Sequence, residues 1–465
     1  MTNALYAPRR NGDVSFWWTQ LGQPAPRAAL PGSTRADVVI VGAGYTGLWT
    51  AYYLKKAAPQ LRIVVLEARF AGFGASGRNG GWLTNSVTGG REQYVKSHGR
   101  PAAEQFQAAM NDTVDEVIRV AAQEGIDAGI IKGGEFTVAY DPAQQHRLER
   151  AARAEQSWAH TDVELLSKTA AQNRINVAGT TGGMWHPHCA RINPAALVAG
   201  LARTAESLGV EIYEDTPVSE IAPHRAVTQY GTVDASFVVR ATEGFTAGLK
   251  GLHRTWLPMN SSLIATEPLA ASVWESIGWS GRETLGDMAH AYMYAQRTSD
   301  DRIAIGGRGV PYRFGSKTDA DGQTPQATVD ALRDILVRFF PATAGARIDH
   351  AWSGVLGVPR DWAATVGLDP QTGLAWGGGY VGTGVATTNL AGRTLTDLIL
   401  GRDSGLVELP WVNHRARSWE PEPLRWLAVT ALYRAYSLAD RAELTGRRTT
   451  SPLARVADVV SGRGR

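Results

Sequence analysis

Glycine spacing is the feature of this sequence with the clearest chemical meaning. The chain has 465 residues, of which 51 are glycine, and composition alone would produce a Gly-x-Gly-x-x-Gly pattern less than once. Three copies occur: Gly42/Gly44/Gly47, Gly72/Gly74/Gly77 and Gly377/Gly379/Gly382. Glycine in a turn lets the backbone approach a phosphate closely. The pattern therefore predicts phosphate-binding turns wherever strands and helices flank it.

The first glycine turn lies between elements of the type that bind dinucleotides. We expect an apolar strand over residues 36–41, a helix over 46–56 and a second strand over 61–66, which ends in Glu67. In such a βαβ unit the glycines form the turn, admit the pyrophosphate and let the helix pack on the strand, while the acidic residue binds the ribose hydroxyls. The predicted cofactor-binding residues here are Gly42, Gly44, Tyr45, Thr46, Gly47, Glu67 and Ala68.

The second glycine cluster begins five residues beyond Glu67 and favours FAD over NAD. A nicotinamide cofactor needs no second glycine-rich loop at this point, whereas FAD adds a ribityl chain and a flavin that require further close backbone approach. We expect Arg78 to neutralise pyrophosphate charge, and Ser76 and Asn79 to hydrogen-bond along the cofactor. Taken alone, the segment fits a flexible surface loop equally well. The predicted binding residues are Gly74, Ala75, Ser76, Arg78, Asn79, Gly80 and Gly81.

The third glycine cluster also lies in a strand–turn–helix sequence. It follows an apolar strand over residues 373–376 and precedes an amphipathic helix over 385–400. The N-terminus of that helix is expected to face the flavin pyrimidine and to stabilise negative charge there. The residues predicted to bind the cofactor are Gly379, Tyr380, Gly382, Thr383 and Gly384.

Composition and charge exclude several classes of protein. Hydrophobic residues make up 44% of the chain, enough for a core, so the chain is not disordered. A net charge of +3 is too small for a dedicated nucleic-acid binder. Cys189 is the single cysteine and cannot form an intramolecular disulfide. With no apolar run of 18 residues and no signal-peptide pattern, we expect a cytoplasmic protein, and an oligomer is compatible with the sequence.

The C-terminal region carries an excess of positive charge. Residues 415–465 contain ten arginines and five acidic residues, a net charge of +5. Residues 423–443 are predicted to form an amphipathic helix. Its apolar stripe consists of Leu424, Leu427, Ala431 and Leu438. Such a helix binds a membrane or a partner, or folds back on its own domain; we favour the last and do not expect membrane association.

Six segments of the sequence resemble a known family. They are VIVGAGYTGLWTAYYL (39–54), VVLEA (64–68), GFGASGRNGG (72–81), VVRATEGFT (238–246), WSGVLGVPRDWAATVG (352–367) and GGGYVGTGVATTNLAGR (377–393). Together they resemble the D-amino-acid-oxidase-like, or glycine/sarcosine oxidase-like, family of FAD-dependent oxidoreductases. The GASGRNGG form is most similar to the γ-glutamylputrescine-oxidase-like branch of that family.

The resemblance implies an α/β fold in which a Rossmann-type FAD-binding domain carries an inserted substrate domain of α+β type with an antiparallel sheet. On this basis the FAD-binding domain comprises residues 36–90, 186–249 and 351–405, and the substrate domain comprises 91–185 and 250–350. The remaining segments are an N-terminal arm, 1–35, and a C-terminal helical extension, 406–465. The resemblance also places three further residues against the cofactor: Val218, Ala241 and Thr242.

The chemistry that the resemblance implies is oxidation of a C–N bond of an amine or amino acid. A hydride equivalent passes to flavin N5, the imine hydrolyses, and oxygen or another acceptor takes the electrons. The amine must react in its neutral form. For an alkylamine with a pKa near 10.4, removing the proton at pH 7 costs about 4 to 5 kcal/mol of free energy. An apolar aromatic pocket lowers that cost.

The candidate catalytic residues lie on the strand that the family places over the flavin. They are Tyr292, Tyr294, Arg297 and the preceding His290, together with Trp352. Either Arg297 or Arg308 is a candidate for pairing with a substrate carboxylate, and a surface ion pair is the alternative for each.

Two departures from the family pattern bear on the acceptor and the flavin linkage. Several amine oxidases of the family place a lysine on the strand that corresponds to residues 302–306, where it assists oxygen reduction, and this chain has none there. A flavin dehydrogenase that passes electrons to a quinone or protein therefore remains an alternative, as does a non-catalytic flavoprotein. Cys189 lies far from the third glycine turn, so we expect non-covalent FAD. The nearby His186 and His188 lack the ligand spacing of a metal site, and no metal is expected.

Overall fold

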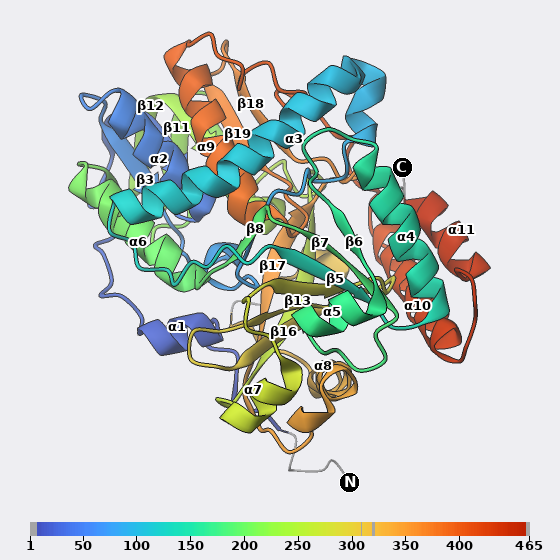
Figure 1. The fold of residues 1–465 in the computed structure, drawn as a ribbon. Coiled ribbons are helices and arrows are strands. Elements are labelled where there is room, and N and C mark those ends of the chain that lie inside the picture. The colour runs from blue at the N-terminus through green and yellow to red at the C-terminus, as the bar shows by residue number, and fades with distance from the viewer. Residues whose placement is uncertain (1–6, 308, 319–320, 462–465) are drawn as a thin grey trace.

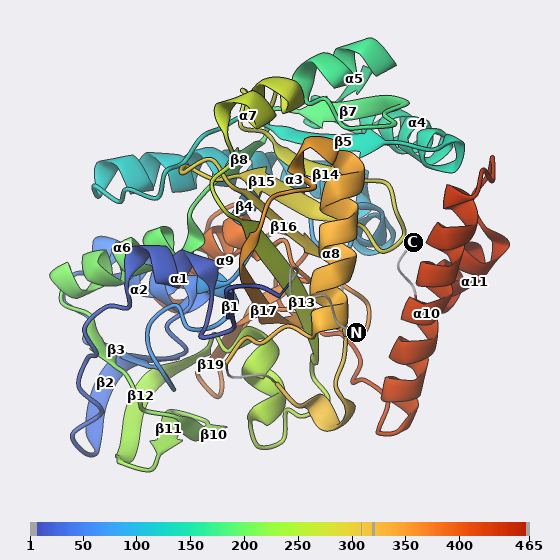
Figure 2. The same cartoon turned by 90° about the horizontal axis from the view of Figure 1, so that it is seen from below.

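The computed structural model describes residues 7–307, 309–318 and 321–461, and Figures 1 and 2 show its elements. Two large β-sheets dominate it. The strands of the first sheet are β2 (Thr34–Val41), β3 (Ile63–Leu66), β9 (Glu211–Tyr213), β10 (Val218–Ala222), β11 (Arg225–Thr228), β12 (Gly231–Arg240), β18 (Thr365–Asp369) and β19 (Leu374–Gly378). Its order is β10-β11-β12-β2-β3-β9, with β19 joining β12 and β18 joining β19.

The parallel centre of this first sheet is the dinucleotide-binding unit that the sequence predicts. Strands β19, β12, β2, β3 and β9 are parallel neighbours, with Val38–Val41 aligned to Ile63–Leu66. Both faces of β3, and of β2 from Val38 onward, are covered, so these residues form buried apolar runs. Helices α2 (Tyr45–Ala57) and α9 (Gly384–Leu400) pack against each other and start at the first and third glycine turns.

The second sheet has nine strands and is mostly antiparallel. Its strands are β1 (Arg10–Asn11), β5 (Glu135–Ala139), β6 (Glu164–Leu166), β7 (Gly182–His186), β13 (Leu257–Thr266), β14 (Thr284–Asp287), β15 (Tyr294–Arg297), β16 (Ile303–Gly307) and β17 (Ile348–Val358). Their order is β1-β17-β13-β16-β15-β14-β5-β7-β6. The fold is thus α/β with a Rossmann-type unit and a largely antiparallel second sheet, as predicted. Strand β17 pairs with β13 over its whole length and so is part of this second sheet.

The remaining elements surround the two sheets. A two-stranded ribbon consists of β4 (Trp82–Thr84) and β8 (Cys189–Arg191). The other helices are α1 (Phe16–Leu21), α3 (Glu92–Gln123), α4 (Pro142–Gln156), α5 (Lys168–Arg174), α6 (Pro194–Ser207), α7 (Ala271–Ile277), α8 (Gln326–Phe339), α10 (Leu424–Leu444) and α11 (Pro452–Ser461). None of the helices described is both long and apolar enough to cross a bilayer.

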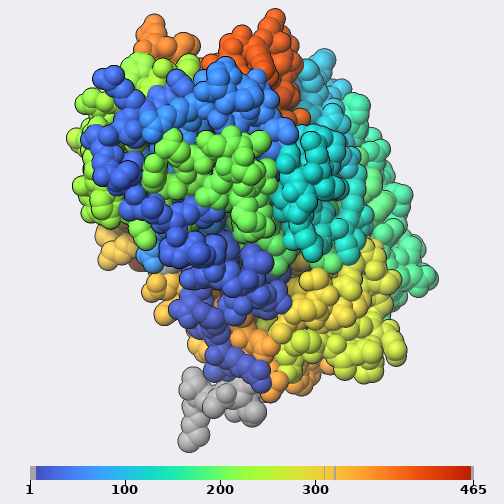
Figure 3. Space-filling view, turned by 90° about the vertical axis from the view of Figure 1, so that its left-hand side faces the viewer, coloured from blue at the N-terminus to red at the C-terminus, as the bar shows by residue number. Residues whose placement is uncertain are grey.

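The N-terminal segment forms more structure than the sequence predicts. An irregular arm is expected over residues 1–35, but Phe16–Leu21 form helix α1, with Ser15 as its N-cap. The Ser15 hydroxyl accepts a hydrogen bond from the Trp18 backbone N–H, and the side chains of Phe16, Trp17 and Trp18 are buried. Figure 3 shows this N-terminal segment, in blue, lying along one face of the molecule.

The contact between α2 and α9 predicts a specific sensitivity. A Cβ atom at Gly392 would lie 2.7 Å from the Trp49 Cβ and 2.8 Å from the Trp49 carbonyl carbon, so Gly392→Ala must push the two helices apart. We expect a loss of about 1–3 kcal/mol in the free energy of unfolding, measured by urea denaturation. Gly345→Ala is the control, because nothing lies within 4 Å of its added Cβ, and an equal loss there would contradict this reading.

Candidate active site

A long cavity of about 700 Å³ lies between the two sheets, within the size range of ligand sites. One end is bounded by Glu67, Ala68 and Val218, at the carboxyl ends of the parallel strands. The other end is bounded by Ser261 and Tyr294 of the nine-stranded sheet. The cavity therefore follows all three glycine turns and continues to the face of the second sheet.

The first glycine turn forms the wall that the sequence predicts. A Cβ at Gly42, where φ is +107°, would lie 2.5 Å from the Ala241 carbonyl oxygen, and one at Gly47 would overlap the Gly42 carbonyl oxygen. Gly47 thus serves helix–strand packing and does not line the cavity. Gly44 is the N-cap of α2, and the N-terminus of a helix suits a phosphate. The wall also includes Tyr45, Thr46, Ala241 and Thr242, as predicted.

Glu67 lies at the predicted ribose end of the cavity. Its Oε2 accepts a hydrogen bond from the Ala43 N–H at 2.9 Å, and its Oε1 accepts one from the Arg69 N–H at 3.0 Å. Burial raises the pKa of this carboxyl above its usual value, against the effect of these two donors. The backbone thereby fixes the carboxylate beside the first turn, where it can accept from a ribose hydroxyl.

The second glycine cluster is an ordered loop whose polar side chains brace its own backbone. Ser76 Oγ accepts from the Tyr45 N–H at 2.8 Å, and Asn79 Nδ2 donates to the Ala75 and Ser76 carbonyls at 3.1 and 3.0 Å. The Gly81 N–H donates to Asn79 Oδ1, and Gly81 lies outside the cavity lining. The others of this cluster that the sequence predicts, Gly74, Ala75, Ser76, Arg78, Asn79 and Gly80, line the cavity.

Helix α1 holds this second loop from outside. Ser15 Oγ donates to the Gly77 carbonyl at 2.7 Å and Trp17 Nε1 donates to the Asn79 carbonyl at 2.9 Å. The indole of Trp18 fills the space beside Gly77, where a Cβ would overlap it. Sequence reasoning missed this contact; its only signal is the Phe-Trp-Trp run directly after a Ser N-cap.

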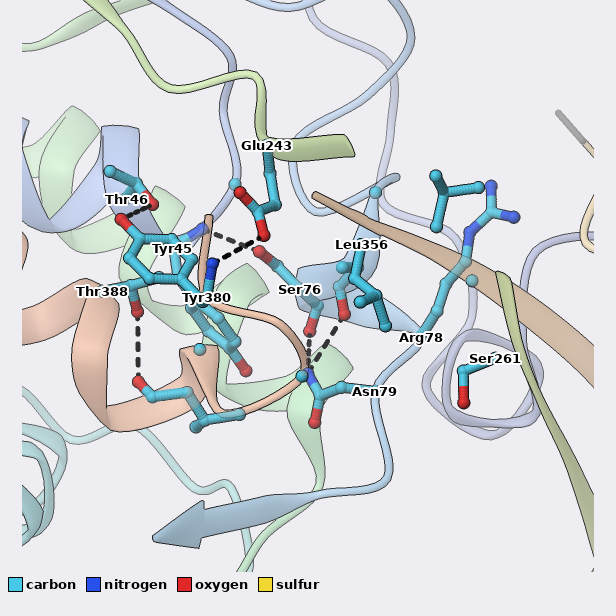
Figure 4. A pocket seen from close by; sticks show the side chains of 18 of the residues that line it. Tyr45, Thr46, Ser76, Arg78, Asn79, Glu243, Ser261, Leu356, Tyr380 and Thr388 are labelled. Atoms are coloured by element: carbon cyan, nitrogen blue, oxygen red, sulfur yellow. Dashed lines mark hydrogen bonds between the residues drawn. The ribbon is translucent and has the colours of Figure 1, made fainter. Parts of the chain in front are cut away.

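Arg78 lines the cavity, but its guanidinium also binds protein backbone. Its Nε donates to the Phe73 carbonyl at 2.7 Å, its Nη1 to the Ser353 carbonyl at 3.3 Å, and its guanidinium lies 4.3 Å from the Phe73 ring centroid. Figure 4 shows the side chain turned away from Tyr45, Ser76 and Tyr380. Arg78 therefore joins the loop to β17, and the N-terminus of α2 also offers positive charge to a pyrophosphate.

Trp352 also supports the loop and does not line the cavity. Its indole Nε1 donates to the Arg78 carbonyl at 2.8 Å, and its side chain is fully buried. Its ring packs against Phe16 and Trp17 of α1, with centroid distances of 5.9 and 6.0 Å. Trp352 was expected to be catalytic, but its side chain lies in the support of the loop and not in the cavity wall.

The third glycine turn depends on Glu243, a residue that the sequence analysis did not select. The Glu243 carboxylate accepts backbone N–H bonds from Gly379 at 2.8 Å, Tyr380 at 3.2 Å and Gly357 of β17 at 3.1 Å (Figure 4). Burial raises its pKa to about 7, opposed by these donors and by Arg240. Gly379, a predicted cofactor residue, uses its N–H in this contact and does not line the cavity. A Cβ atom at this position would collide with Pro359.

The rest of the third turn faces the cavity as predicted. Tyr380, Gly382, Thr383 and Gly384 line it at the start of α9. The Tyr380 and Thr46 hydroxyls are 2.9 Å apart and connect the first and third turns. Both helix N-termini therefore open toward the same cavity.

Tyr292 and Tyr294 lie in the cavity wall, in agreement with the prediction. The Tyr294 ring lies against Gly80 and Gly306, where added Cβ atoms would collide with it. Its hydroxyl is 2.7 Å from Ser261 Oγ on β13. Glycine at positions 80 and 306 thus makes room for an aromatic ring between the second loop and the sheet.

Arg297 and His290 lie away from the cavity, contrary to expectation. Arg297 pairs with Asp301 at 2.7 Å and lies 3.9 Å from the Trp274 ring centroid, on the other side of its strand. The His290 ring is 3.0 Å from Glu443 of α10 and stacks on Tyr436. Neither side chain lines the cavity. Arg308 lies outside the described residues.

Two carboxyl groups, also missed by the sequence analysis, line the cavity: Glu135 is partly buried and Asp287 is buried. Glu135 Oε2 accepts from Thr84 Oγ1 at 2.8 Å and is 3.6 Å from His186 Nε2. Burial alone would raise its pKa, but His186 and Thr84 lower it below the usual value. Asp287 accepts from the Met293 N–H at 3.1 Å, and burial raises its pKa to about 7.

The residues present fit FAD. The close contact of Gly42 with Ala241 leaves no space for a side chain, and the N-termini of α2 and α9 supply donors to the same cavity. Glu67 and Val218 lie at the end expected for the adenosine, and the aromatic end at Tyr292 and Tyr294 lies beyond all three turns. The fold and this cavity are those of a two-sheet dinucleotide-binding flavoprotein.

Comparisons with known proteins agree. Residues 37–398 match the DAO family, described as FAD dependent oxidoreductase. The chain is 29% identical over 397 residues to gamma-glutamylputrescine oxidoreductase of Escherichia coli, covering 83% of this chain and 89% of that protein. It is 26% identical to a probable oxidoreductase, OrdL, of Haemophilus influenzae, covering 84% and 89% of the two chains.

A solved structure shows the same fold. The crystal structure of glycine oxidase from Geobacillus kaustophilus superimposes with a TM-score of 0.65 at 24% identity, covering 82% of this chain and 99% of that one. Since the family match spans most of the sequence, the chain belongs to the DAO family of FAD-dependent oxidoreductases.

Glu243 predicts one outcome for cofactor binding. Glu243→Gln replaces one acceptor oxygen by an amide NH2 that faces backbone N–H donors, so the third turn loses at least one strong hydrogen bond. Losing a hydrogen bond to a charged group costs about 1.5–3 kcal/mol. We expect FAD affinity, measured by titrating the apoprotein, to fall roughly tenfold or more. Glu220→Gln, on an exposed ion pair with Lys250, is the control and leaves affinity unchanged.

Asp287 predicts a pH dependence of stability. Its pKa is about 7 in the folded chain and near 4 when unfolded, so between these values only the folded state holds the proton. The free energy of unfolding therefore falls as pH rises from 4 to 7, by up to roughly 4 kcal/mol from this group, and Glu243 adds in the same direction. Asp287→Asn makes the decline shallower in denaturant titrations across this range. An unchanged slope, equal to that of the exposed control Asp403→Asn, would contradict this assignment.

Proposed function

We propose that this chain oxidises the C–N bond of an amine, with FAD held non-covalently in the cavity. The observation that carries the proposal is the substrate end of the cavity, where Tyr292, Tyr294 and Trp82 adjoin the carboxylate of Glu135. FAD, when bound, supplies the two-electron acceptor. The names of the relatives, which include a γ-glutamylputrescine oxidoreductase and glycine oxidases, support this class of reaction.

The aromatic side chains favour the reactive form of the amine. An ammonium group loses water contacts when it enters the space beside Tyr292, Tyr294, Trp82 and Met293, and this lowers its pKa toward neutrality. The nitrogen lone pair is then available to form the C=N bond as the hydride equivalent leaves the adjacent carbon. The resulting imine hydrolyses in water.

Glu135 indicates the substrate class. Its side chain is about 20% exposed and its pKa is lowered, so it stays ionised at neutral pH. An ionised carboxylate at the end of an aromatic cavity attracts a second, positively charged group of the substrate. We therefore propose a substrate that carries a cationic group away from the reacting amine, such as a diamine or a derivative of one.

The lining supports non-covalent attachment. No cysteine or histidine is among the described lining residues. Cys189 is buried in β8 with its Sγ 3.3 Å from Thr284 Oγ1, and burial raises the pKa of its thiol. Acid precipitation is expected to release the flavin into the supernatant; flavin that stays with the protein pellet would contradict this.

The acceptor has two candidates. Oxygen, giving hydrogen peroxide, is the first. A quinone or electron-transfer protein is the second, and it is favoured by one observation: β16 has the sequence Ile-Ala-Ile-Gly-Gly, and no lysine lines the described part of the cavity.

Anaerobic reduction of the bound flavin tests the activity. Diamines are expected to bleach the yellow absorbance of the FAD-loaded protein in the absence of oxygen. Formation of hydrogen peroxide when air is admitted identifies oxygen as the acceptor. Bleaching that is reversed only by an added quinone identifies the dehydrogenase. No bleaching across a panel of amines and amino acids would overturn the proposal.

Glu135→Gln tests the substrate class. Removing the negative charge is expected to raise KM about tenfold or more for a diamine and to leave KM for a monoamine of equal length within about twofold. Glu164→Gln, an exposed position on β6, is the control. Equal effects on both substrates, or faster oxidation of amino acids than of diamines by the native protein, would contradict a cation-binding role.

A further inference from the structure

We propose that α10 and α11 form a helical hairpin whose exposed apolar face binds the surface of an anionic lipid bilayer. The hairpin lies at the margin of the molecule in both Figure 1 and Figure 2 and outside the segment that matches the family. Eight of its large apolar side chains are exposed, from 43% for Leu453 to 71% for Val459. They are Leu424, Leu427, Leu438, Leu444, Leu453, Val456, Val459 and Val460.

The sequence predicts the stripe on α10, and the structure shows that it faces solvent. Successive residues of a helix are 100° apart, so Leu424, Leu427 and Leu438 lie within about 60° of one another. The buried positions Val429 and Tyr436 lie on the opposite side. The helix does fold back on its own domain, but it docks with the other face and leaves the leucines uncovered.

Helix α11 carries a second exposed apolar stripe. Leu453, Val456 and Val460 also lie within about 60° of one another. The Tyr436 hydroxyl donates to Asp458 at 2.9 Å and Glu443 accepts from the Ser451 N–H at 2.8 Å, so the helices are antiparallel. The buried residues of α11, Ala454, Ala457 and Ser461, lie on another side of that helix, so this stripe faces solvent as the stripe of α10 does.

Acidic and basic side chains of the hairpin lie in different surroundings. Its acidic side chains are turned inward: Asp440 accepts from the His290 and Ala291 N–H groups at 2.8 and 3.0 Å, Glu443 pairs with Arg147 at 2.6 Å, and Asp458 binds Tyr436. The exposed charges are arginines without an ion-pair partner among the described residues. They are Arg434, Arg441, Arg447, Arg448 and Arg455.

This combination fits an anionic bilayer better than a second copy of the chain. Leucine and valine stripes flanked by arginines insert at the level of the lipid headgroups, where each arginine gains from the negative surface potential. Two copies joined through the same face would bring ten arginines together with no carboxylate between them, which opposes self-association. A bilayer supplies both the apolar phase and the negative charge.

The inner side of the hairpin contacts the segment that enters the active site. Asp440 and Glu443 hold His290 and Ala291, and Arg147 donates to the Met288 carbonyl at 2.8 Å. This segment leads directly to Tyr292 and Met293 in the cavity wall. Membrane contact would therefore act on an element joined to the substrate end of the site, while leaving these inner contacts in place.

Sedimentation with lipid vesicles tests the proposal on the FAD-loaded protein. We expect binding to phosphatidylcholine vesicles that contain phosphatidylglycerol, at least about tenfold stronger than to phosphatidylcholine alone, and weakened by raising the salt concentration. The variant Leu427→Ser/Leu438→Ser/Val456→Ser is expected to lose binding, and Arg434→Gln/Arg441→Gln/Arg455→Gln to lose the preference for anionic lipid. The control Leu21→Ser/Leu165→Ser changes exposed leucines elsewhere and keeps binding.

The same variants distinguish membrane binding from self-association and from loss of the fold. All of these positions are exposed, so the melting temperature and flavin content of each variant are expected to match the native protein. Absence of vesicle binding, or binding that the serine variant retains, would overturn the proposal. A native dimer that the serine variant converts to a monomer, without vesicle binding, would instead assign the face to self-association. These outcomes are independent of whether amines reduce the flavin.

Discussion

The buried carboxylate of Glu243 is the interaction on which the arrangement of the cavity depends. It accepts N–H bonds from Gly379 and Tyr380 of the third glycine turn and from Gly357 of β17, so one side chain joins the dinucleotide-binding sheet to the nine-stranded sheet. A buried carboxyl group is tolerated only when hydrogen bonds replace its water. Of the three donors, Tyr380 lines the cavity, Gly379 precedes it in the third turn and Gly357 lies on β17, so the same side chain supports the turn and joins it to the second sheet.

The second loop is fixed in the same way by distant partners. Arg78 binds two backbone carbonyls, Trp352 donates to the Arg78 carbonyl, and Trp17 donates to that of Asn79. These contacts come from β17 and from α1, at the two sides of the loop. A rigid loop leaves its backbone and small residues facing the cavity, which is what an extended cofactor requires.

The sequence was sufficient to predict the features that depend on local rules. Gly47, the apolar strands and the acidic residue after the second strand belong to one βαβ unit, in which Gly47 packs against Ile40 and the Gly42 carbonyl, and each is found where the sequence predicts it. The motif order also led to the correct fold class. Tyr292 and Tyr294 were found because the resemblance placed their strand over the flavin.

The features that were missed depend on contacts between residues far apart in the chain. The position of His290 is decided by Glu443 of α10, and the guanidinium of Arg78 is held partly by Ser353 of β17, partners that no spacing rule predicts. Glu135 and Asp287 reach the cavity only because β5 and β14 are neighbours in the sheet. Likewise, the stripe on α10 is visible in the sequence, but only the structure shows which face of the helix docks.

The central claim is that the cavity holds a complete FAD, with its adenosine half at Glu67 and its flavin at Tyr294. Titration of the flavin-free protein with FAD and with FMN, followed by flavin fluorescence, tests this most directly. FMN shares the flavin and the first phosphate but lacks the adenosine monophosphate half, so we expect it to bind at least about 100-fold more weakly than FAD. Equal affinity for the two would contradict the assignment of the first glycine turn and Glu67 to the cofactor.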